Sequence, residues 1–248
     1  NNTAVGYQAG YTNTTGVNNL SLGYQAGYTN ATSNYNTAVG TQSLANNTGS
    51  NNVALGQSAL FSNTTASNNT AVGYQAGYST TTDGENTAVG SQAFYSNTTG
   101  NRNVALGREA LYSNTTADGN TAVGFEAALN NTTAELNSAL GFNALRTNTT
   151  GGNNVALGAS ALYSNTTASN NTALGSQAGY SRTGSGNTCI GQYSGRDGTS
   201  GTDNTLIGRN AGYHITSGSN NTIIGTYDGN SGGLDIRTSS NNIVLSDG

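Results

Sequence analysis

The chain has 248 residues, only 7% of them charged, and contains no Lys, Pro, Met or Trp. Its formal net charge of −4 gives neither the basic stripe of a nucleic-acid-binding protein nor the high net charge typical of a disordered chain, so we expect an ordered protein with no nucleic-acid partner. No apolar run approaches the roughly 18 residues of a membrane-spanning helix, and we therefore expect no membrane insertion.

A five-residue motif, Asn-Thr-Ala-Val-Gly at residues 2–6, recurs with small changes until it has occurred fifteen times. From Gly6 to Gly225, the motif glycines are 17 residues apart eleven times and 16 residues apart twice. A constant period in this range indicates stacked structural units. Seventeen residues are too few for a βαβ unit, and no helical periodicity is present. The sequence therefore predicts an all-β parallel β-solenoid (β-roll) with one 17-residue repeat per coil and about 14–15 coils.

Each repeat begins with a predicted strand that ends at the motif glycine. The residue before this glycine is Val, Leu or Ile in every copy, the residue two positions before it is mostly Ala, and the residue three positions before it is mostly Thr or Val. Such β-branched residues favour a strand. Alternation along the strand places the Thr/Val and Val/Leu/Ile columns on one face and the Asn, Ala and Gly columns on the other.

The position four residues before the glycine is Asn in all fifteen copies. Because coils stack about 4.8 Å apart, equivalent residues form columns, and stacked amide side chains can bond to their neighbours. A left-handed backbone conformation at this position is an alternative explanation for the constant Asn. We predict an internal, structural Asn ladder composed of Asn2, Asn19, Asn36, Asn52, Asn69, Asn86, Asn103, Asn120, Asn137, Asn154, Asn171, Asn187, Asn204, Asn221 and Asn242.

After the glycine, the sequence predicts a second short strand and then a turn rich in Asn, Thr, Ser and Gly. Tyr is frequent at the fifth position after the glycine. Tyrosine rings can stack on sugars while a neighbouring Gln bonds to hydroxyl groups, or they can cover coil edges or fill a seam between chains. The candidate glycan-facing aromatics are Tyr11, Tyr28, Tyr78, Tyr95, Tyr112, Tyr163, Tyr180 and Tyr213.

Other reactive residue types are scarce. Cys189 stands in the Ala column, so we expect a buried small side chain, and we expect His214, the single histidine, to be exposed. No catalytic set, metal site or cofactor site is predicted, and we expect that the protein is not an enzyme. The turns also contain sequons such as Asn63-Thr64-Thr65, Asn97-Thr98-Thr99 and Asn165-Thr166-Thr167, which an Asn/Thr-rich composition produces readily, so we expect no glycosylation there.

The domain organisation follows from the end of the regular array. Residues 1–230 form the regular repeats. Nine of the eighteen charged residues lie from Arg182 onward, and the last motif copy comes four residues late, after 231–237. We assign 231–248 to a last irregular repeat that leads towards a further C-terminal region.

Two resemblances extend over nearly the whole chain. The strings Val53-Ala54-Leu55-Gly56 and Asn103-Val104-Ala105-Leu106-Gly107 resemble the head repeats of trimeric autotransporter adhesins, which implies a left-handed β-roll of three chains that binds host surfaces. The longer string at 69–78 is similar to repeats of phage tail-fibre-like proteins. The closing residues 240–248 resemble the stretch that leads to a self-cleaving chaperone domain in such fibres.

These observations favour a structural fibre segment, the shaft or head of a virion tail fibre or surface adhesin. It would lie on the virion surface or outside the cell, mediate or support attachment to a host surface, and have glycans as candidate ligands. We expect a homotrimer in which the small Ala and Gly residues of the strands allow close contact between chains. The alternatives are a self-assembling extracellular filament, suggested by the uncapped first repeat, and an ice-binding solenoid, suggested by the Thr column, which Val53, Val104 and Val155 interrupt.

Overall fold

The fold is a parallel β-solenoid, as the repeat period predicts. The computed structural model describes residues 1–82 and 84–246, and within these residues it is all-β, with about 14 turns of about 17 residues and no helix. The chain forms two compact units, Asn1–Val123 and Gly124–Gly248, which are described separately below.

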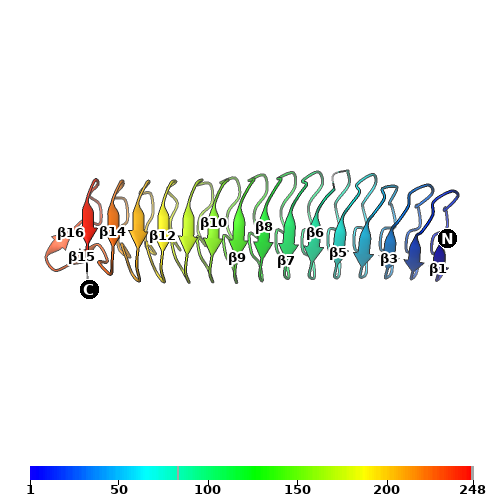
Figure 1. The fold of residues 1–248 in the computed structure, drawn as a ribbon, viewed down its shortest axis with the longest axis horizontal. Helices are drawn as coiled ribbons and strands as arrows, with labels where there is room; N and C mark the ends of the chain where they lie inside the picture. Colours follow the sequence, from blue (N-terminus) through cyan, green and yellow to red (C-terminus); the bar gives the residue numbers. More distant parts are fainter. Residues whose placement is uncertain (83, 247–248) are drawn as a thin grey trace. The chain divides into compact units, whose positions relative to one another are not determined.

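In both units the principal strands have three residues and follow one another in chain order (Figure 1). Unit 1 contains β1 (Thr3–Val5), β2 (Leu20–Leu22), β3 (Thr37–Val39), β4 (Val53–Leu55), β5 (Thr70–Val72), β6 (Thr87–Val89), β7 (Val104–Leu106) and β8 (Thr121–Val123). Unit 2 contains β9 (Ser138–Leu140), β10 (Val155–Leu157), β11 (Thr172–Leu174), β12 (Thr188–Ile190), β13 (Thr205–Ile207), β14 (Thr222–Ile224), β15 (Asn230–Ser231), β16 (Leu234–Asp235) and β17 (Ile243–Leu245).

Neighbouring motif strands within each unit pair in parallel and in register, so equivalent residues of successive coils lie opposite each other. Thr70 pairs with Thr87, and Val72 pairs with Val89. The middle Ala of β3–β11 points into the solenoid and is at most 2% exposed, whereas the Thr/Val and Val/Leu columns point outward. The expectation that the Ala face contacts other chains is therefore wrong: this face is the interior of each coil.

The motif glycine is required where the strand ends. Gly73 has φ +138°, and a Cβ at this position would lie 2.4 Å from the carbonyl oxygen of Gly90 in the next coil. Coils stacked at the spacing of a parallel sheet leave no room for a side chain at this point. The constant glycine thus reflects both its backbone conformation and the close approach of the next coil.

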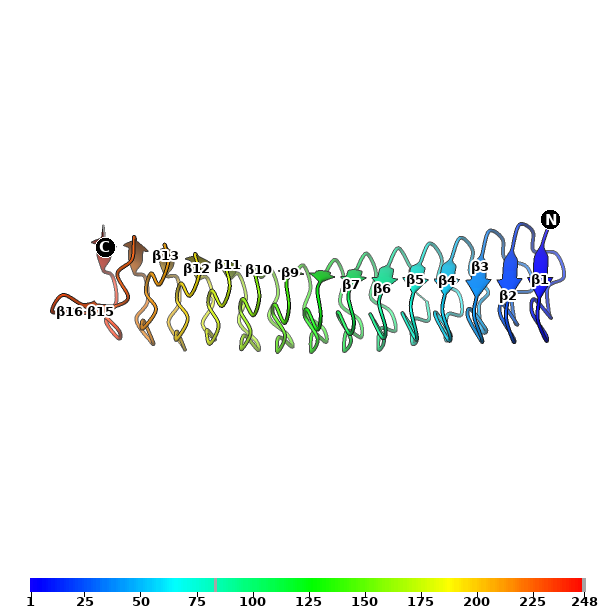
Figure 2. The same cartoon turned by 90° about the horizontal axis from the view of Figure 1, so that it is seen from below.

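The predicted second strand is absent from the described coils that begin with β1–β13, and a run of turns replaces it. In the coil after β6, Gln92 and Phe94 both have positive φ, near +55°, which is incompatible with a strand. As a result Ala93 and Phe94, although adjacent in sequence, are both buried, whereas a strand would place them on opposite faces. The inter-coil hydrogen bonds are nevertheless kept: Phe94 N–H donates to Ala110 O over 2.9 Å. Figure 2 shows the strands along one side of the coils and these turns on the opposite side.

The irregular C-terminal stretch is an insertion within the last coil. Strands β15 and β16 pair antiparallel in a short excursion that projects beyond the coils of unit 2 (Figure 2). After it, β17 pairs in parallel with β14, with Thr222 opposite Ile243. The last motif copy therefore rejoins the solenoid in register despite its longer approach.

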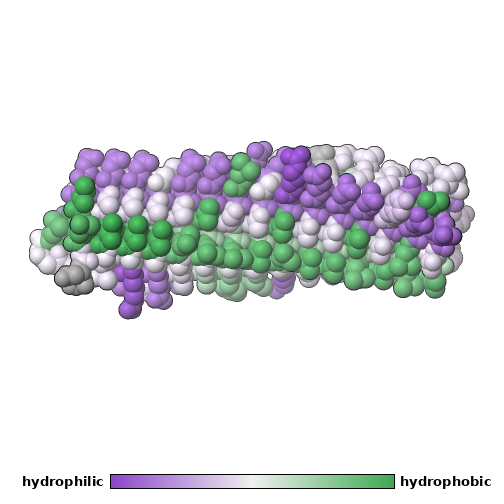
Figure 3. Space-filling model, in the orientation of Figure 1, coloured by the Kyte–Doolittle hydropathy of each residue, from purple (hydrophilic) through white to green (hydrophobic). Residues whose placement is uncertain are grey.

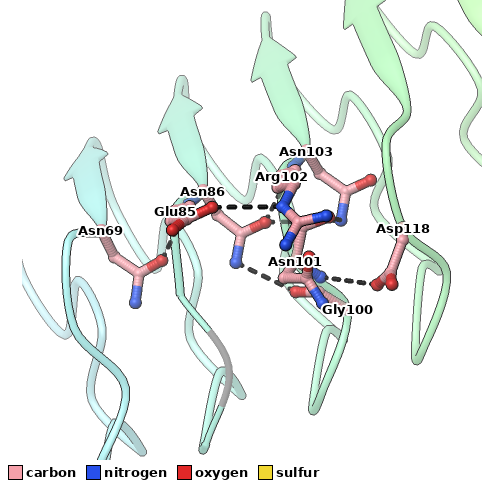
Figure 4. A network of polar contacts seen from close by, with 8 residues as sticks. All are labelled: Asn69, Glu85, Asn86, Gly100, Asn101, Arg102, Asn103 and Asp118. Carbon is pink, nitrogen blue, oxygen red and sulfur yellow. Dashed lines mark hydrogen bonds and ion pairs between the residues drawn. The ribbon is translucent and has the colours of Figure 1, made fainter.

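The predicted Asn ladder is internal. All its members are at most 5% exposed except Asn2 and Asn242, which belong to the first and last coils. Within each unit, the Oδ1 of a ladder Asn accepts the backbone N–H of the next ladder Asn, as Asn69 does from Asn86 (3.0 Å) and Asn86 does from Asn103 (2.9 Å). Figure 4 shows these residues side by side. The ladder thus bonds mainly to backbone groups rather than amide to amide. The left-handed alternative is wrong for these positions, because the positive φ belongs to the preceding residue, such as Glu85 or Arg102.

A second Asn ladder, seven residues after the motif glycine, was not predicted. Its buried members are Asn30, Asn47, Asn63, Asn97, Asn114, Asn131, Asn148 and Asn165. In most of the coils that carry both ladders, the two Asn side chains converge on one carbonyl. Gly100 O accepts Asn86 Nδ2 and Asn97 Nδ2, each over 3.0 Å, and Ala168 O accepts Asn154 Nδ2 (2.9 Å) and Asn165 Nδ2 (3.0 Å). Since a buried carbonyl without a partner is costly, this pair of hydrogen bonds stabilises the interior of the coils that carry both ladders.

The second ladder ends in unit 2 at Arg182, which takes the Asn position and is fully buried. Its Nη1 donates to Asn187 Oδ1 (3.1 Å) and Gly201 O (3.3 Å). The next coil has Gly198 at this position, and a Cβ there would lie 2.3 Å from Arg182 Nη2. The guanidinium therefore fills the space of the side chain that Gly198 lacks, and the coil after that carries the apolar Ile215.

Candidate functional surfaces

The outward face of the strands is flat and largely apolar in each unit. Figure 3 shows an apolar band over the strands. In unit 1, Val53, Leu55 and Leu106 are 38%, 44% and 38% exposed, and in unit 2, Leu140 and Leu157 are 47% and 40% exposed. Large aliphatic side chains repeated on one face make this the main exposed apolar surface of each unit.

The predicted tyrosine column forms stacks on the turn side. The rings of Tyr78, Tyr95 and Tyr112 follow one another with centroids 5.1 Å apart and interplanar angles below 10°. Tyr11 with Tyr28 and Tyr163 with Tyr180 are stacked in the same way. All the candidate glycan-facing tyrosines except Tyr11 are half-buried, because each ring covers its neighbours. Burial and the neighbouring phenols raise the pKa of the Tyr95 hydroxyl.

Gln side chains form an additional ladder close to the tyrosines. Gln92 Nε2 donates to Gln75 Oε1 (3.2 Å), and Gln25 Nε2 donates to Gln8 Oε1 (3.0 Å). These amides therefore bond to one another along the stack. The stacked rings and bonded amides form an amphipathic surface along the coils, on which the same residue types recur at the same positions.

In unit 2 an arginine enters the tyrosine column. The guanidinium carbon of Arg196 lies 5.4 Å from the ring centre of Tyr180 and 5.5 Å from that of Tyr213, within the range of cation–π contacts. Its Nη1 also donates to the Tyr213 hydroxyl and to Asp197 Oδ1, both over 2.9 Å. The column is therefore continued by charge and hydrogen bonds where its aromatic pattern breaks.

Two hollows on these surfaces are lined by polar side chains. In unit 1, Ser67 and Asp118 occupy one repeat position, and the side chain of each accepts a backbone N–H bond from the preceding coil. Gly84 occupies the same position without a side chain, and a hollow of about 300 Å³ lies there. The exposed ion pair of Glu85 and Arg102 borders this hollow (Figure 4). In unit 2, a hollow of about 190 Å³ is lined by Asn210, Tyr213, His214 and Asp228. Neither hollow was predicted, because each depends on a departure from the repeat.

The remaining predicted residues lie as follows. Cys189 is buried, and burial raises the pKa of its thiol. His214 is exposed, as expected. The sequon residues Asn63, Asn97 and Asn165 are fully buried members of the second ladder, so their amides bond to backbone carbonyls rather than facing solvent.

The described residues include no group of three His, Cys, Asp or Glu side chains placed to hold a metal ion. A search of the same residues found no helix long and apolar enough to cross a membrane. Comparison with known proteins gave no match: no family model, curated protein or solved structure matches this chain.

Proposed function

We propose that this chain is a non-catalytic structural segment of a fibre, the shaft or head of a virion tail fibre or a surface adhesin, which supports attachment to a host surface outside the cell. The observation that carries the proposal is the Asn ladder and the in-register strand pairing that continue from coil to coil within each unit. These bonds, with Gln amides in some coils of unit 1, hold the coils together with little apolar core. Such a stack is suited to stiffness and to repeated surface contacts.

We further propose that the working form is a homotrimer, with the outward strand face as its contact surface. A sheet face in water is expected to be polar, yet this one carries Val53, Leu55 and Leu106 in an exposed row. A second copy has the same rows at the same spacing, so the aliphatic side chains of the two faces can interdigitate. The three-fold number comes from the resemblance to adhesin and fibre repeats.

The test is the mass of the native particle by light scattering. We expect three chains at micromolar concentration, and we expect the double variant Leu55→Glu/Leu106→Glu to give single chains with unchanged β circular dichroism. Thr116→Glu, which adds a charge in an exposed turn of the same unit, should remain trimeric. A folded monomer for the unsubstituted chain would refute the trimer, and an open-ended mass distribution would favour the filament.

Ice binding is a second candidate, because the structure places the Thr column on the flat outward face. Thr70 and Thr87 lie in register there beside Val72 and Val89. Thermal hysteresis in the native protein, lost in Thr87→Lys, would support this function over attachment. Freezing without hysteresis would exclude it.

A further inference from the structure

We propose that the hollow lined by Asn210, Tyr213, His214 and Asp228 is a binding subsite for one neutral or amino hexose. The inference rests on the attachment function proposed above and gives it a location and a sugar class. At about 190 Å³, the hollow is smaller than the ~300–1,000 Å³ of pockets for drug-sized ligands, which suits a single sugar ring.

The sequence builds this hollow by replacing repeat residues in three successive coils. Six residues after the motif glycine, earlier coils carry Ser, Thr or Asn, but here the position is Asp197 and then His214. In the next coil the turn is shorter, and Asp228 takes the place that Tyr213 has in the coil before, because His214 N–H bonds to Asp228 O as Asp197 N–H bonds to Tyr213 O. His214 N–H donates to Asp228 O (2.8 Å), so the two side chains come from adjacent coils of unit 2.

The His214 and Asp228 side chains of the hollow are held in place. His214 Nδ1 lies 3.3 Å from Asp197 Oδ2, and its imidazole meets the Tyr213 ring edge-on with centroids 4.6 Å apart. A proton on Nδ1 leaves Nε2 as an acceptor for a ligand hydroxyl. Asp228 Oδ1 accepts bonds from Ser231 Oγ (2.6 Å) and from the N–H of Asn230 (2.9 Å), which orients its carboxylate.

These groups match the chemistry of a sugar ring. The rings of Tyr213 and His214 offer apolar surface to its C–H groups, as amphipathic aromatic side chains do in ligand sites. The Asn210 amide can both donate to and accept from hydroxyls, and the Asp228 carboxylate accepts only. Few converging polar groups on a partly aromatic wall are typical of a specific small-molecule site.

Charge selects the class of sugar. Arg196 lies near the hollow, but its Nη1 is bonded to Asp197 and to the Tyr213 hydroxyl. The Asp228 carboxylate therefore dominates the lining, and His214 is its only lining partner capable of carrying positive charge. This carboxylate would repel a carboxylated sugar and attract an ammonium group, whereas a neutral hexose has no net charge to be repelled.

His214 also provides the reporter for the test, because it is the single histidine and its imidazole C–H NMR signals are isolated. The full chain is titrated with the methyl glycosides of glucose, galactose and mannose, and with glucosamine and glucuronic acid. We expect saturable shifts of the His214 signals with at least one neutral or amino sugar, at millimolar affinity, and at least tenfold weaker binding of glucuronic acid.

Asp228→Asn should weaken binding of the responding sugar at least tenfold. The matched control is Ser164→Ala, at the position of His214 three coils earlier in unit 2, and it should leave the affinity unchanged. No response to any neutral or amino sugar, equal affinity for glucuronic acid, or equal affinity in Asp228→Asn would each overturn the proposal. Glycan co-sedimentation that is retained in Asp228→Asn without His214 shifts would reject this subsite and leave attachment intact. A monomeric mass with His214 shifts present would refute the trimer and leave the subsite intact.

Discussion

At the scale of residues, neutral amides do the work that apolar packing does in most proteins. Gly100 O accepts one bond from Asn86, at the start of the same repeat, and one from Asn97. Neither donor is ionised, so both can be buried without the desolvation cost of a charge. The two amides share one acceptor, which makes their contributions interdependent.

This sharing predicts non-additive substitutions. Asn86→Ala and Asn97→Ala should each reduce the free energy of unfolding by ~1–3 kcal/mol, because buried partners are lost. The double variant should cost more than the sum, by ~0.5–3 kcal/mol, since only there does Gly100 O lose both side-chain donors. Urea denaturation of the four proteins measures the coupling. Strictly additive costs would show that the carbonyl does not link the ladders.

At the scale of the coil, the glycine after each strand controls stacking. Gly73→Ala should destabilise by at least ~3 kcal/mol, because it combines a strained φ with a clash against Gly90 O. Gly232→Ala is the matched control: its φ is also positive, +62°, but nothing lies within 4 Å of the added Cβ. Its cost should be only ~1–2 kcal/mol. If thermal melts show equal destabilisation of the two variants, backbone conformation alone explains why glycine stands after each strand.

The sequence predicted the strand, its period, its columns and the internal Asn ladder, since all of these follow from a pattern that is the same in every copy. It did not reveal which face is interior, because Ala and Val are both compatible with burial. The predicted second strand was wrong because composition does not show alternating positive φ at non-glycine residues such as Gln92 and Phe94. The second Asn ladder was hidden in turns that read as ordinary loop composition, although its 17-residue recurrence was the available signal.

The candidate sites were predictable to a smaller extent. The stacking of Tyr78, Tyr95 and Tyr112 follows from their shared repeat position. The hollow beside His214 does not, because it is formed by side chains of different repeat positions in adjacent coils. A site that forms where the repeat is broken can be predicted only when the position of the altered residues in adjacent coils is known.

At the scale of the whole molecule, stability should depend little on pH near neutrality, since the ladders do not titrate. We expect a constant melting temperature between about pH 5 and pH 8. Hydrogen bonds from Arg237 lower the pKa of Asp235 to about 2 from 3.8, and hydrogen bonds to its carboxylate outweigh burial to lower the pKa of Asp228. Their stabilising effect is therefore present above about pH 3.8 and is lost as the pH falls through the lowered values.

At alkaline pH, stability changes in the opposite direction: it falls as the pH rises. Burial raises the pKa of Cys189 above its ordinary 9.0, so its contribution is present below pH 9.0 and is lost as the pH rises through the raised value. Cys189→Ala, which restores the common residue of this column, should reduce the loss that begins near pH 9.0. Scanning calorimetry across the pH range tests both the acid and the alkaline loss of stability. A melting temperature that changes steeply around pH 7 would contradict an interior whose ladder amides do not titrate.

Near-identical coils create an ambiguity during folding, because a coil could dock on the wrong neighbour with most of its ladder bonds intact. Arg182 removes that ambiguity locally. Docked on the adjacent coil, its guanidinium enters the space above Gly198, but if one coil were skipped it would meet Ile215, which offers neither room nor acceptors. Arg182 and Gly198, a pair that does not repeat, thus specify which coils are neighbours in a chain whose other interior residues are largely interchangeable.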